Sequence, residues 1–436
     1  MRTLLETLLC ATVVACGGSR ERDPQAPPPA RPVTGIDVPP GSTLQQAIDA
    51  APAGATLLLQ AGEYRGPFVI EKPLHVWGPP TAVLNAVDGS TLSVKADHVT
   101  LAGFTVAGSG QRFDLMDGGV HLQGDDLTIE GVVVRDTLFG ILVERCNRAT
   151  VRGNTVIGTG LPAMGLRGDG IRLWETNDSE VVGNTVRDSR DVVVWYSSRN
   201  HLADNTVTGS RYGTHFMYSH DNVCEHSRYV GDEVGIFVMY SHGIVLRRNL
   251  LARSGGAAGI GIGLKESGDI AVEDSWLLDN TTGLYIDSAP LDPDHHNHYL
   301  RNVLRFCETA VAMHASAKRS EFKDNQFGDN GAVVKVGGQG DALACEFVGN
   351  WYDTYQGYDL DGDGRGDVPF EFRRLSTQIE ARYPELAILH GAPAMGMVDL
   401  VGEVLPLFAP RRLMQDPAPR LRPTAMAFSP EVDRAR

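Results

Sequence analysis

Soft metal ligands recur at a fixed interval near the middle of the chain. Met217 and Met239 are 22 residues apart, and each lies in a similar segment, YGTHFMYSH or VGIFVMYSH. One interval earlier, in VVVWYSS, the matching position holds Trp195. Thioethers and imidazoles together suit Cu(I). His215, Met217, Met239 and His242 are therefore the candidate copper ligands. The alternative, a methionine surface for packing or adaptable partner contacts, stays open.

Acidic residues alternate in a later segment, NWYDTYQGYDLDGDGRGDVPF. Four of them match positions 1, 3, 5 and 9 of a calcium-binding loop, with Gly364 at position 6. Phe370 stands at position 12, where such loops carry a bidentate Glu. The spacing favours a structural calcium site over a solvated acidic turn. Its candidate ligands are Asp359, Asp361, Asp363 and Asp367.

The elements that must position these residues repeat along the chain. Ten short apolar strands begin at intervals of 21 to 30 residues. The first and third positions after each start are apolar, except at Thr214, which indicates strands with one buried face. The starts are Gly119, Gly140, Gly170, Asp191, Gly213, Gly235, Gly261, Gly283, Ala310 and Gly331.

Asparagine-containing turns, such as GNTV at Gly153 and Gly183, fall about half a repeat after the strands. Stacked turns of this kind can form an internal asparagine ladder. Several short strands within each repeat predict a solenoid. Leucine-rich repeats are disfavoured because the Leu-x-x-Leu-x-Leu rhythm is missing. We predict an all-β chain forming a right-handed parallel β-helix, with an N-terminal capping helix and an irregular C-terminal extension.

The repeat assigns some large apolar side chains to the outside of this β-helix. Exposed apolar patches usually mark binding surfaces, which makes Trp174, Trp195 and Phe237 candidate partner-binding residues. A covering loop would be the alternative. One expected exposed row, which we call the outward row, consists of Trp174, Trp195, Met217 and Met239.

The composition and the N-terminal segment indicate where the chain works. A formal charge of -15, from 54 acidic and 39 basic side chains, argues against nucleic-acid binding. Residues 1–15 resemble a lipoprotein signal peptide ending in Val-Val-Ala, with Cys16 as the lipidated residue. An ordinary secretory signal is the alternative. Residues 16–35 form a proline-rich tether.

Four further cysteines would then lie in an oxidising compartment. They are Cys146, Cys224, Cys307 and Cys345. Coils of a β-helix are ~4.8 Å apart, so cysteines several coils apart exceed the ~7 Å that a disulfide permits. We expect them to be buried and unpaired.

The predicted organisation has three parts after the tether: a β-helix at 36–350, an aspartate-rich loop region at 351–372 and a docking segment at 373–436. The last segment is apolar, but interruptions such as Pro393 and Asp399 exclude a bilayer span. It is expected to lie on a partner or a membrane surface. Truncation after Phe372 is expected to leave the β-helix folded, because stacked coils contact only their neighbours.

The chain resembles the NosD family over about residues 37–423. The resemblance rests on GPFVIEKPL, YGTHFMYSHDN, VGIFVMYSHGI, NWYDTYQGYDLDGDGRGD and DPAPRLRP. It implies a periplasmic, non-enzymatic accessory protein. Its implied partners are an inner-membrane ABC transporter, a copper chaperone and nitrous-oxide reductase, whose copper-sulfur centres they assemble during denitrification. The resemblance does not settle which residues carry copper.

Two rival functions remain open. Many β-helices are lyases or epimerases of acidic polysaccharides, which need convergent acids or an acid–base pair in an exterior groove. The segment DPDHHNH, with His295, His296 and His298, loosely resembles the acid–histidine cluster of alginate epimerases, although an exposed polar loop is favoured. Uronate release from alginate or pectin would support that class. The other rival is a metal-free assembly scaffold.

Overall fold

The computed structural model describes residues 29–41, 44–315, 318–338, 340–389, 392–426 and 428–429. The predicted signal peptide, the lipidation site Cys16 and residues 16–28 of the tether lie outside the described residues. Among the residues described, no helix has the length and apolar character needed to cross a membrane.

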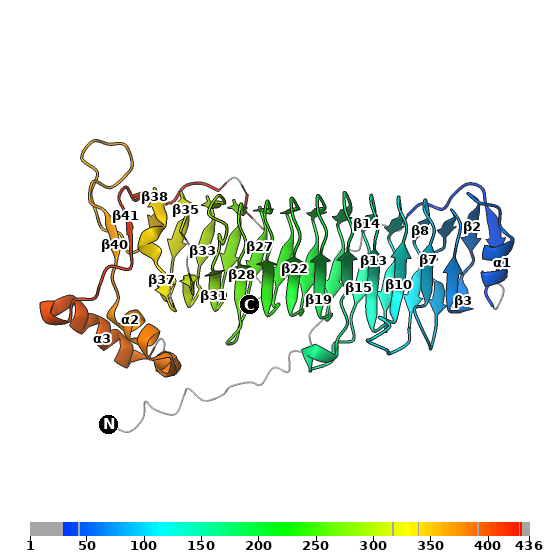
Figure 1. The fold of residues 1–436 in the computed structure, drawn as a ribbon, viewed down its shortest axis with the longest axis horizontal. Coiled ribbons are helices and arrows are strands. Elements are labelled where there is room, and N and C mark those ends of the chain that lie inside the picture. Colours follow the sequence, from blue (N-terminus) through cyan, green and yellow to red (C-terminus); the bar gives the residue numbers. More distant parts are fainter. Residues whose placement is uncertain are drawn as a thin grey trace, which may run out of the picture.

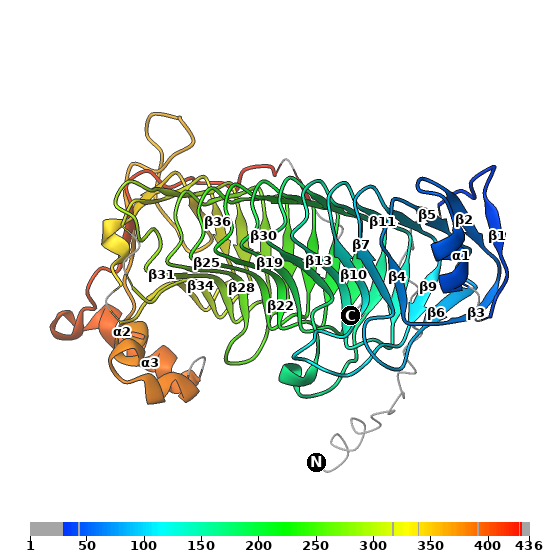
Figure 2. The same cartoon turned by 45° about the vertical axis from the view of Figure 1, so that its right-hand side comes forward.

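Three long parallel sheets wrap around one interior (Figures 1 and 2). Sheet A has 14 strands, from β1 (Ile36–Val38) to β38 (Glu346–Val348). Sheet B has 13, from β3 (Gly62–Arg65) to β39 (Trp351–Tyr352), and sheet C has 12. Successive members of each sheet come from successive coils and pair in parallel, which confirms the predicted parallel β-solenoid.

Sheet C contains the predicted repeat. Each of the ten predicted starts lies within one residue of the first residue of a sheet C strand. The strands are β4 (Phe68–Ile70), β7 (Leu92–Lys95), β10 (Gly118–Gln123), β13 (Phe139–Glu144), β16 (Ile171–Trp174), β19 (Asp191–Trp195), β22 (Tyr212–Met217), β25 (Val234–Met239), β28 (Ile260–Lys265), β31 (Thr282–Asp287), β34 (Thr309–Met313) and β37 (Ala332–Val336).

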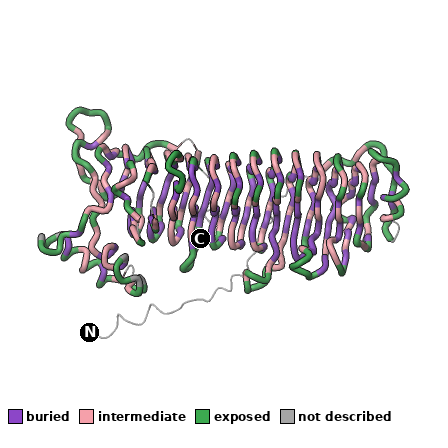
Figure 3. The backbone as a smooth tube through the Cα atoms, in the orientation of Figure 1, coloured by how far each residue is buried: buried purple, intermediate pink, exposed green. Residues whose placement is uncertain are grey.

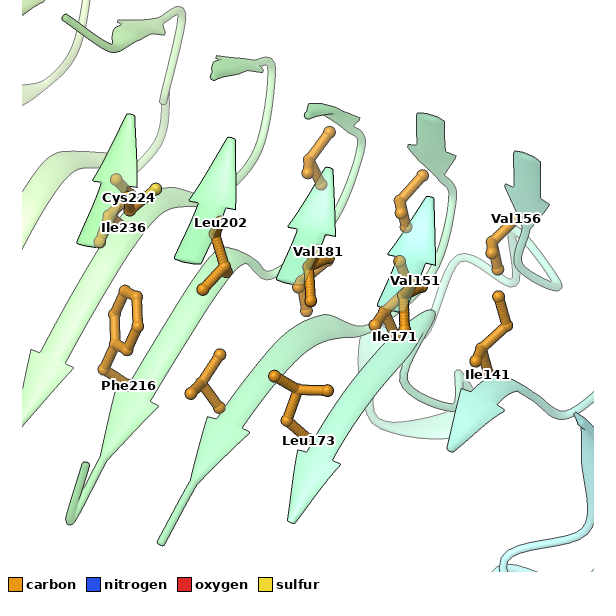
Figure 4. Packing of buried hydrophobic residues seen from close by; sticks show 14 of the residues in the cluster. Ile141, Val151, Val156, Ile171, Leu173, Val181, Leu202, Phe216, Cys224 and Ile236 are labelled. Carbon is orange, nitrogen blue, oxygen red and sulfur yellow. The ribbon is translucent and has the colours of Figure 1, made fainter. Parts of the chain in front are cut away.

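The apolar columns fill the interior. Ile171, Phe216 and Ile236 are buried and point inward from β16, β22 and β25 of sheet C (Figure 4). The polar exception, Thr214, is satisfied because its hydroxyl lies 2.9 Å from that of Tyr229. Figure 3 shows the same pattern as buried stretches along each coil, with exposure concentrated in the C-terminal part and at the turns. Alternation along each strand therefore leaves every second residue free for surface chemistry.

Asparagine side chains form the predicted internal ladder. The backbone N–H of Asn154 donates to Oδ1 of Asn184, and that of Asn184 to Oδ1 of Asn205, both at 3.0 Å. Each of these three amide groups also donates to a backbone carbonyl. Buried polar groups at the turns are thus paired, which fixes the stacking of one coil on the next.

At the N-terminal end, helix α1 (Leu44–Ala50) buries Leu44 and Ile48 in the common core. Three cysteines behave as predicted. Cys146, Cys224 and Cys307 are buried and form no disulfide.

The C-terminal extension differs from the irregular segment that was predicted. It contains α2 (Leu375–Arg382), η3 (Pro384–Leu389), α3 (Pro393–Val404) and η4 (Pro406–Phe408). Two short strands, β40 (Phe370–Phe372) and β41 (Met414–Asp416), pair antiparallel. Pro393, which was expected to interrupt the segment, begins α3, and Pro406 begins η4, as proline permits at a first helical turn.

The C-terminal extension packs on the end of the solenoid through contacts that the sequence did not predict. Asp416 is fully buried and accepts hydrogen bonds from the backbone N–H and the side-chain amide of Asn350, both at 2.9 Å. The Tyr352 hydroxyl also donates to it, at 3.3 Å. Met414 is fully buried as well. β41 therefore caps the asparagine ladder, and truncation after Phe372 would remove that cap.

Candidate functional site

Strand pairing assembles the outward row in the predicted order. Trp174 pairs with Trp195, Trp195 with Met217, and Met217 with Met239. Paired positions on neighbouring strands are ~4.8 Å apart, so the two methionine side chains are adjacent. The row differs from the prediction in that all four side chains are half-buried rather than exposed.

His215 is almost completely buried, with 4% of its surface exposed. The rings of Trp195, Tyr212 and Phe237 surround it at centroid distances of 5.4, 4.7 and 6.4 Å. The Trp195 indole N–H donates to His215 Nδ1 at 3.2 Å. Burial lowers the pKa of His215 to about 4, so the ring is neutral at pH 7.

This hydrogen bond decides which nitrogen of His215 carries the proton. Because Nδ1 accepts, Nε2 holds the hydrogen of the neutral ring. Nε2 is buried, and no group of the described residues accepts its hydrogen. His215 can therefore ligate a metal through Nε2 only after its proton moves.

The structure does not support Phe237 as an exposed partner anchor. Only 8% of Phe237 is exposed. Its ring occupies the space left by Gly263 on the next strand, where an added Cβ would lie 2.4 Å from the ring. The sequence pattern placed Phe237 on the outside correctly, but the missing side chain of Gly263 lets the ring fold down onto the sheet.

The two tryptophans stay partly accessible and are held by a cation. The guanidinium of Arg172 lies 4.6 Å from the Trp174 ring centroid and 5.1 Å from that of Trp195. Asp169, which is fully buried, bonds Arg172 at 3.2 Å and also bonds Arg190. Burial raises the pKa of Asp169. This network was not predicted, although one acidic and two basic residues around an apolar strand were a visible signal in the sequence.

The Tyr-Ser pairs of the repeat form the corner next to the outward row. Tyr196, Tyr218 and Tyr240, here called the corner tyrosines, have φ near +50° and stack at centroid distances of 5.3 and 5.0 Å. The serines that follow them point inward and form a buried hydrogen-bonded ladder. The interval was read from the sequence, but the ring stack was not predicted.

The structure places His242 beyond the corner that follows Met239. It follows the corner tyrosine Tyr240 and pairs with His220, on which its ring stacks at 3.8 Å. His295 from a later loop adds to this stack at 5.5 Å, in the space that Gly268 leaves open. Parallel stacked rings direct their lone pairs side by side rather than toward one point. His242 thus belongs to a histidine row beyond the corner.

The aspartate loop, residues 359–367, projects outside the solenoid near its C-terminal end (Figure 1). Asp359, Asp361 and Asp363 each offer an oxygen within 4.8 Å of the others. Backbone N–H groups of Gly364 and Gly362 bond Asp359 and lower the pKa of its carboxyl. Three converging carboxylate oxygens suit a hard cation.

Two members of the predicted calcium pattern have other contacts. Asp367 accepts from the backbone N–H of Leu360 at 2.6 Å, so it braces the loop. Phe370, at position 12, stacks on Tyr352 at 3.9 Å and helps close the solenoid end. The missing glutamate of the pattern is thus explained by packing at this position.

Comparisons with known proteins agree with the sequence resemblance. Residues 158–357 match the family model described as periplasmic copper-binding protein (NosD). The chain is 25% identical over 400 residues to a probable ABC transporter binding protein NosD of Stutzerimonas stutzeri, covering 83% of this chain and 88% of that one. A protein of the same description from Pseudomonas aeruginosa is 24% identical over 378 residues, covering 80% and 84%.

Among solved structures, the catalytic unit of an α-1,3-glucanase from Streptomyces thermodiastaticus is similar in fold. The TM-score is 0.50 with 14% identity, covering 76% of this chain and 68% of that chain. At this identity the likeness concerns the β-helix architecture alone.

Proposed function

We propose that this chain is a NosD-type protein that serves in the periplasm as a partner of an ABC transporter and holds Cu(I) transiently at Met217 and Met239. In this role it takes copper from a copper chaperone and passes it toward nitrous-oxide reductase. It needs no catalytic residue, because its task is to bind, position and release an ion.

One observation carries the proposal: the register of β22 and β25 sets Met217 directly beside Met239 on the outer face of the sheet. Two thioethers at neighbouring positions can share one soft cation. Their half-burial limits competition from water while leaving one side open for transfer.

The surroundings support weak rather than permanent binding. His215 lies two positions before Met217 on the same face of β22, but its hydrogen bond from Trp195 favours the tautomer that cannot ligate through Nε2. Two thioether ligands, without the imidazole of His215, should bind Cu(I) weakly. Weak binding suits transfer of the ion better than storage. Trp174, Trp195 and the corner tyrosines would form the surface on which a donor or acceptor protein docks.

The C-terminal extension supports the proposed contact with the transporter or the membrane. Its helices expose Met397, Leu400, Val404 and Leu407, at 69, 58, 65 and 89%. Exposed apolar side chains at this density usually mark an interface. In the same proposal, lipidation at Cys16 anchors the protein to a membrane, and calcium bound at the aspartate loop has a structural role.

The function is tested in cells that depend on this protein for an active reductase. Replacing both methionines, Met217→Leu with Met239→Leu, removes the sulfur atoms and keeps bulk and apolarity. We expect normal protein levels and reductase with reduced copper content. Reductase fully loaded with copper in the double variant would refute the copper role and favour the metal-free scaffold.

A second candidate function rests on one contact of sheet C. His121 Nε2 lies 3.0 Å from Glu144 Oε2, and this contact lowers the pKa of the Glu144 carboxyl. Such a pair is the minimum for acid–base chemistry on a polysaccharide. Uronate release from alginate or pectin, lost in Glu144→Gln, would establish that activity.

A further inference from the structure

His215 lies between two aromatic rings, and each ring is held by an arginine. The Trp195 indole N–H donates to His215 Nδ1 at 3.2 Å, and the centroid of the Tyr212 ring lies 4.7 Å from that of the imidazole. The guanidinium of Arg172 lies 5.1 Å from the centroid of the Trp195 ring. On the other side, that of Arg211 lies 4.6 Å from the centroid of the Tyr212 ring. A cation over an aromatic face contributes about 0.5–2 kcal/mol, so each arginine restricts the ring that it contacts.

Two fully buried carboxylates fix these arginines. Asp169 accepts a hydrogen bond from Arg172 at 3.2 Å, and Asp191 accepts one from Arg211 Nε at 3.0 Å. Arg190 joins the two sides, because its Nε donates to Asp169 at 2.9 Å and lies 3.7 Å from Asp191. Charge-assisted bonds are about twice as strong as neutral ones, so the two sides support His215 as one unit. We call this unit the His215 clamp: Asp169, Arg172 and Trp195 on one side, Asp191, Arg211 and Tyr212 on the other, with Arg190 between them.

The clamp keeps two buried donors without partners. His215 Nε2 and Arg172 Nε are both buried, and neither meets an acceptor within the part of the chain that the structure describes. Leaving such a donor unpaired costs about 1–3 kcal/mol. Apolar side chains could pack the same face without that cost. The clamp is therefore explained better by its effect on His215 than by a contribution to stability.

We infer that the His215 clamp determines metal selectivity: it keeps the imidazole from ligating, so that the outward row accepts Cu(I) and rejects divalent ions such as Zn(II). This inference rests on the proposed binding of Cu(I) at Met217 and Met239. Thioethers select Cu(I), whereas imidazole also suits Zn(II) and Ni(II). Two thioethers alone are therefore selective, and an added imidazole would reduce that selectivity.

His215 is placed to join the thioethers once it is released. It lies two positions before Met217 on the same face of β22. A strand rises ~3.3 Å per residue, so the Cα atoms of the two residues are about 6.6 Å apart. Imidazole and sulfur ligands lie about 2.0–2.3 Å from a bound ion, and an imidazole and a flexible thioether can meet on one ion across that span. The hydrogen bond from Trp195 therefore decides whether His215 is available to an ion at the outward row.

The test measures the affinity of the purified, delipidated protein for Zn(II) by titration calorimetry, with Zn(II) as the only added metal. Arg172→Leu removes the cation over Trp195, while Asp169 keeps its bond from Arg190. We expect Zn(II) to bind at least about tenfold more tightly than in the parent, a difference of about 1.4 kcal/mol. Trp195→Phe, which keeps an aromatic ring and deletes the N–H bonded to His215, should show the same gain even if Arg172→Leu does not fold.

Three further variants assign the gain to the clamp. Adding His215→Phe to Arg172→Leu should abolish the gain, because the extra ligand is then missing. Arg172→Lys keeps a cation over the tryptophan and should retain the Zn(II) affinity of the parent. Arg187→Leu is the matched control, because this half-buried arginine lies in β18 (Thr185–Arg187) of sheet B rather than in sheet C. Its Zn(II) affinity should equal that of the parent.

Two results for Zn(II) would overturn the inference: equal affinity in the parent, Arg172→Leu and Trp195→Phe, or a gain that survives His215→Phe. Cu(I) titration separates such a failure from a failure of the proposed function. Unchanged Cu(I) affinity in Met217→Leu with Met239→Leu would refute the proposed copper site. Normal Cu(I) binding by the methionines without any gain in Zn(II) affinity in the clamp variants would refute the selectivity role alone.

Discussion

The outward row and the aspartate loop are two candidate metal regions built in opposite ways. Met217 and Met239 are placed by the register of a 12-stranded sheet and are half-buried. Asp359, Asp361 and Asp363 lie outside the sheets, and their shape depends on hydrogen bonds within one short loop. One region offers soft sulfur and the other hard oxygen.

The difference shows which ligand positions the solenoid determines and which depend on a loop outside it. Sheet register positions ligands before any ion arrives, so little rearrangement is needed for an ion to enter or leave the outward row. A loop of mutually repelling carboxylates gains order when a cation neutralises it. We therefore expect the outward row to govern transfer and the aspartate loop to govern local stability.

The largest expected effect on stability comes from removing the Asp416 contacts at the C-terminal end of the solenoid, near the aspartate loop. Asp416→Ala leaves the buried donors of Asn350 without an acceptor, which should cost about 3–5 kcal/mol of unfolding free energy. Hydrogen exchange should show lost protection in β38 and β39, while β22 and β25 stay protected. Gln415→Ala, at a half-buried neighbouring position, is the control. Equal loss of protection in β22 would show that the two regions are not independent.

A smaller effect is expected at the corner that precedes β25, whose other end carries Met239 of the outward row. Asp232 is buried, accepts from the Ser210 N–H, and has a carboxyl pKa raised well above its usual range by burial. Because the folded pKa exceeds the unfolded one, the penalty is absent at low pH, grows above pH ~4 and levels off above the folded pKa.

Asp232→Asn should therefore stabilise the protein at pH 7 by about 1–2 kcal/mol and leave it unchanged at pH 3. The reciprocal variant Asn280→Asp, at the equivalent ladder position, should destabilise at pH 7. Denaturant unfolding at both pH values measures this. A pH-independent gain in Asp232→Asn would contradict the assignment.

Calcium should affect the aspartate loop and leave the outward row unchanged. Its addition should raise the melting temperature by a few degrees relative to EDTA and slow proteolysis within residues 359–367, because it binds the folded loop. Asp359→Asn with Asp361→Asn should abolish both effects and leave Cu(I) binding unchanged. Identical melting curves with calcium and EDTA would remove the structural calcium site from the account.

The smallest expected effect is on Cu(I) affinity and concerns His215, whose Nε2 carries a proton and so cannot ligate. Trp195→Phe deletes the N–H that bonds His215 Nδ1, so the ring proton can move and Nε2 can ligate. Cu(I) affinity should rise severalfold, by about 1 kcal/mol. Trp174→Phe, which removes no bond to His215, should change it little. Weaker binding in Trp195→Phe would mean that the indole supports the site.

Residue spacing was sufficient to predict local strand starts and the neighbours across the sheet. The alternation around Gly213 and Gly235 predicted the two strands, and the constant interval predicted that Met217 would pair with Met239. Parallel stacking turns such an interval directly into contact, which is why the outward row was visible without a structure.

The sequence pattern did not predict contacts that depend on a glycine leaving space or on segments far apart in the chain. Phe237 is buried because Gly263 leaves room for its ring, and His242 stacks on His220 beyond the corner at Tyr240. Asp416 meets Asn350 from 66 residues away. No periodic pattern carries that information, so the contact of Asp416 with the solenoid end was not predicted.

The most direct test of the central claim is sulfur coordination of Cu(I) on the purified, delipidated protein. X-ray absorption after titration with one equivalent of Cu(I) should show sulfur ligands in the parent. Met217→Leu with Met239→Leu should lose the sulfur signal and bind at least about tenfold more weakly, a difference of about 1.4 kcal/mol, with an unchanged melting temperature. A copper spectrum with only nitrogen and oxygen ligands, identical in both proteins, would contradict the account.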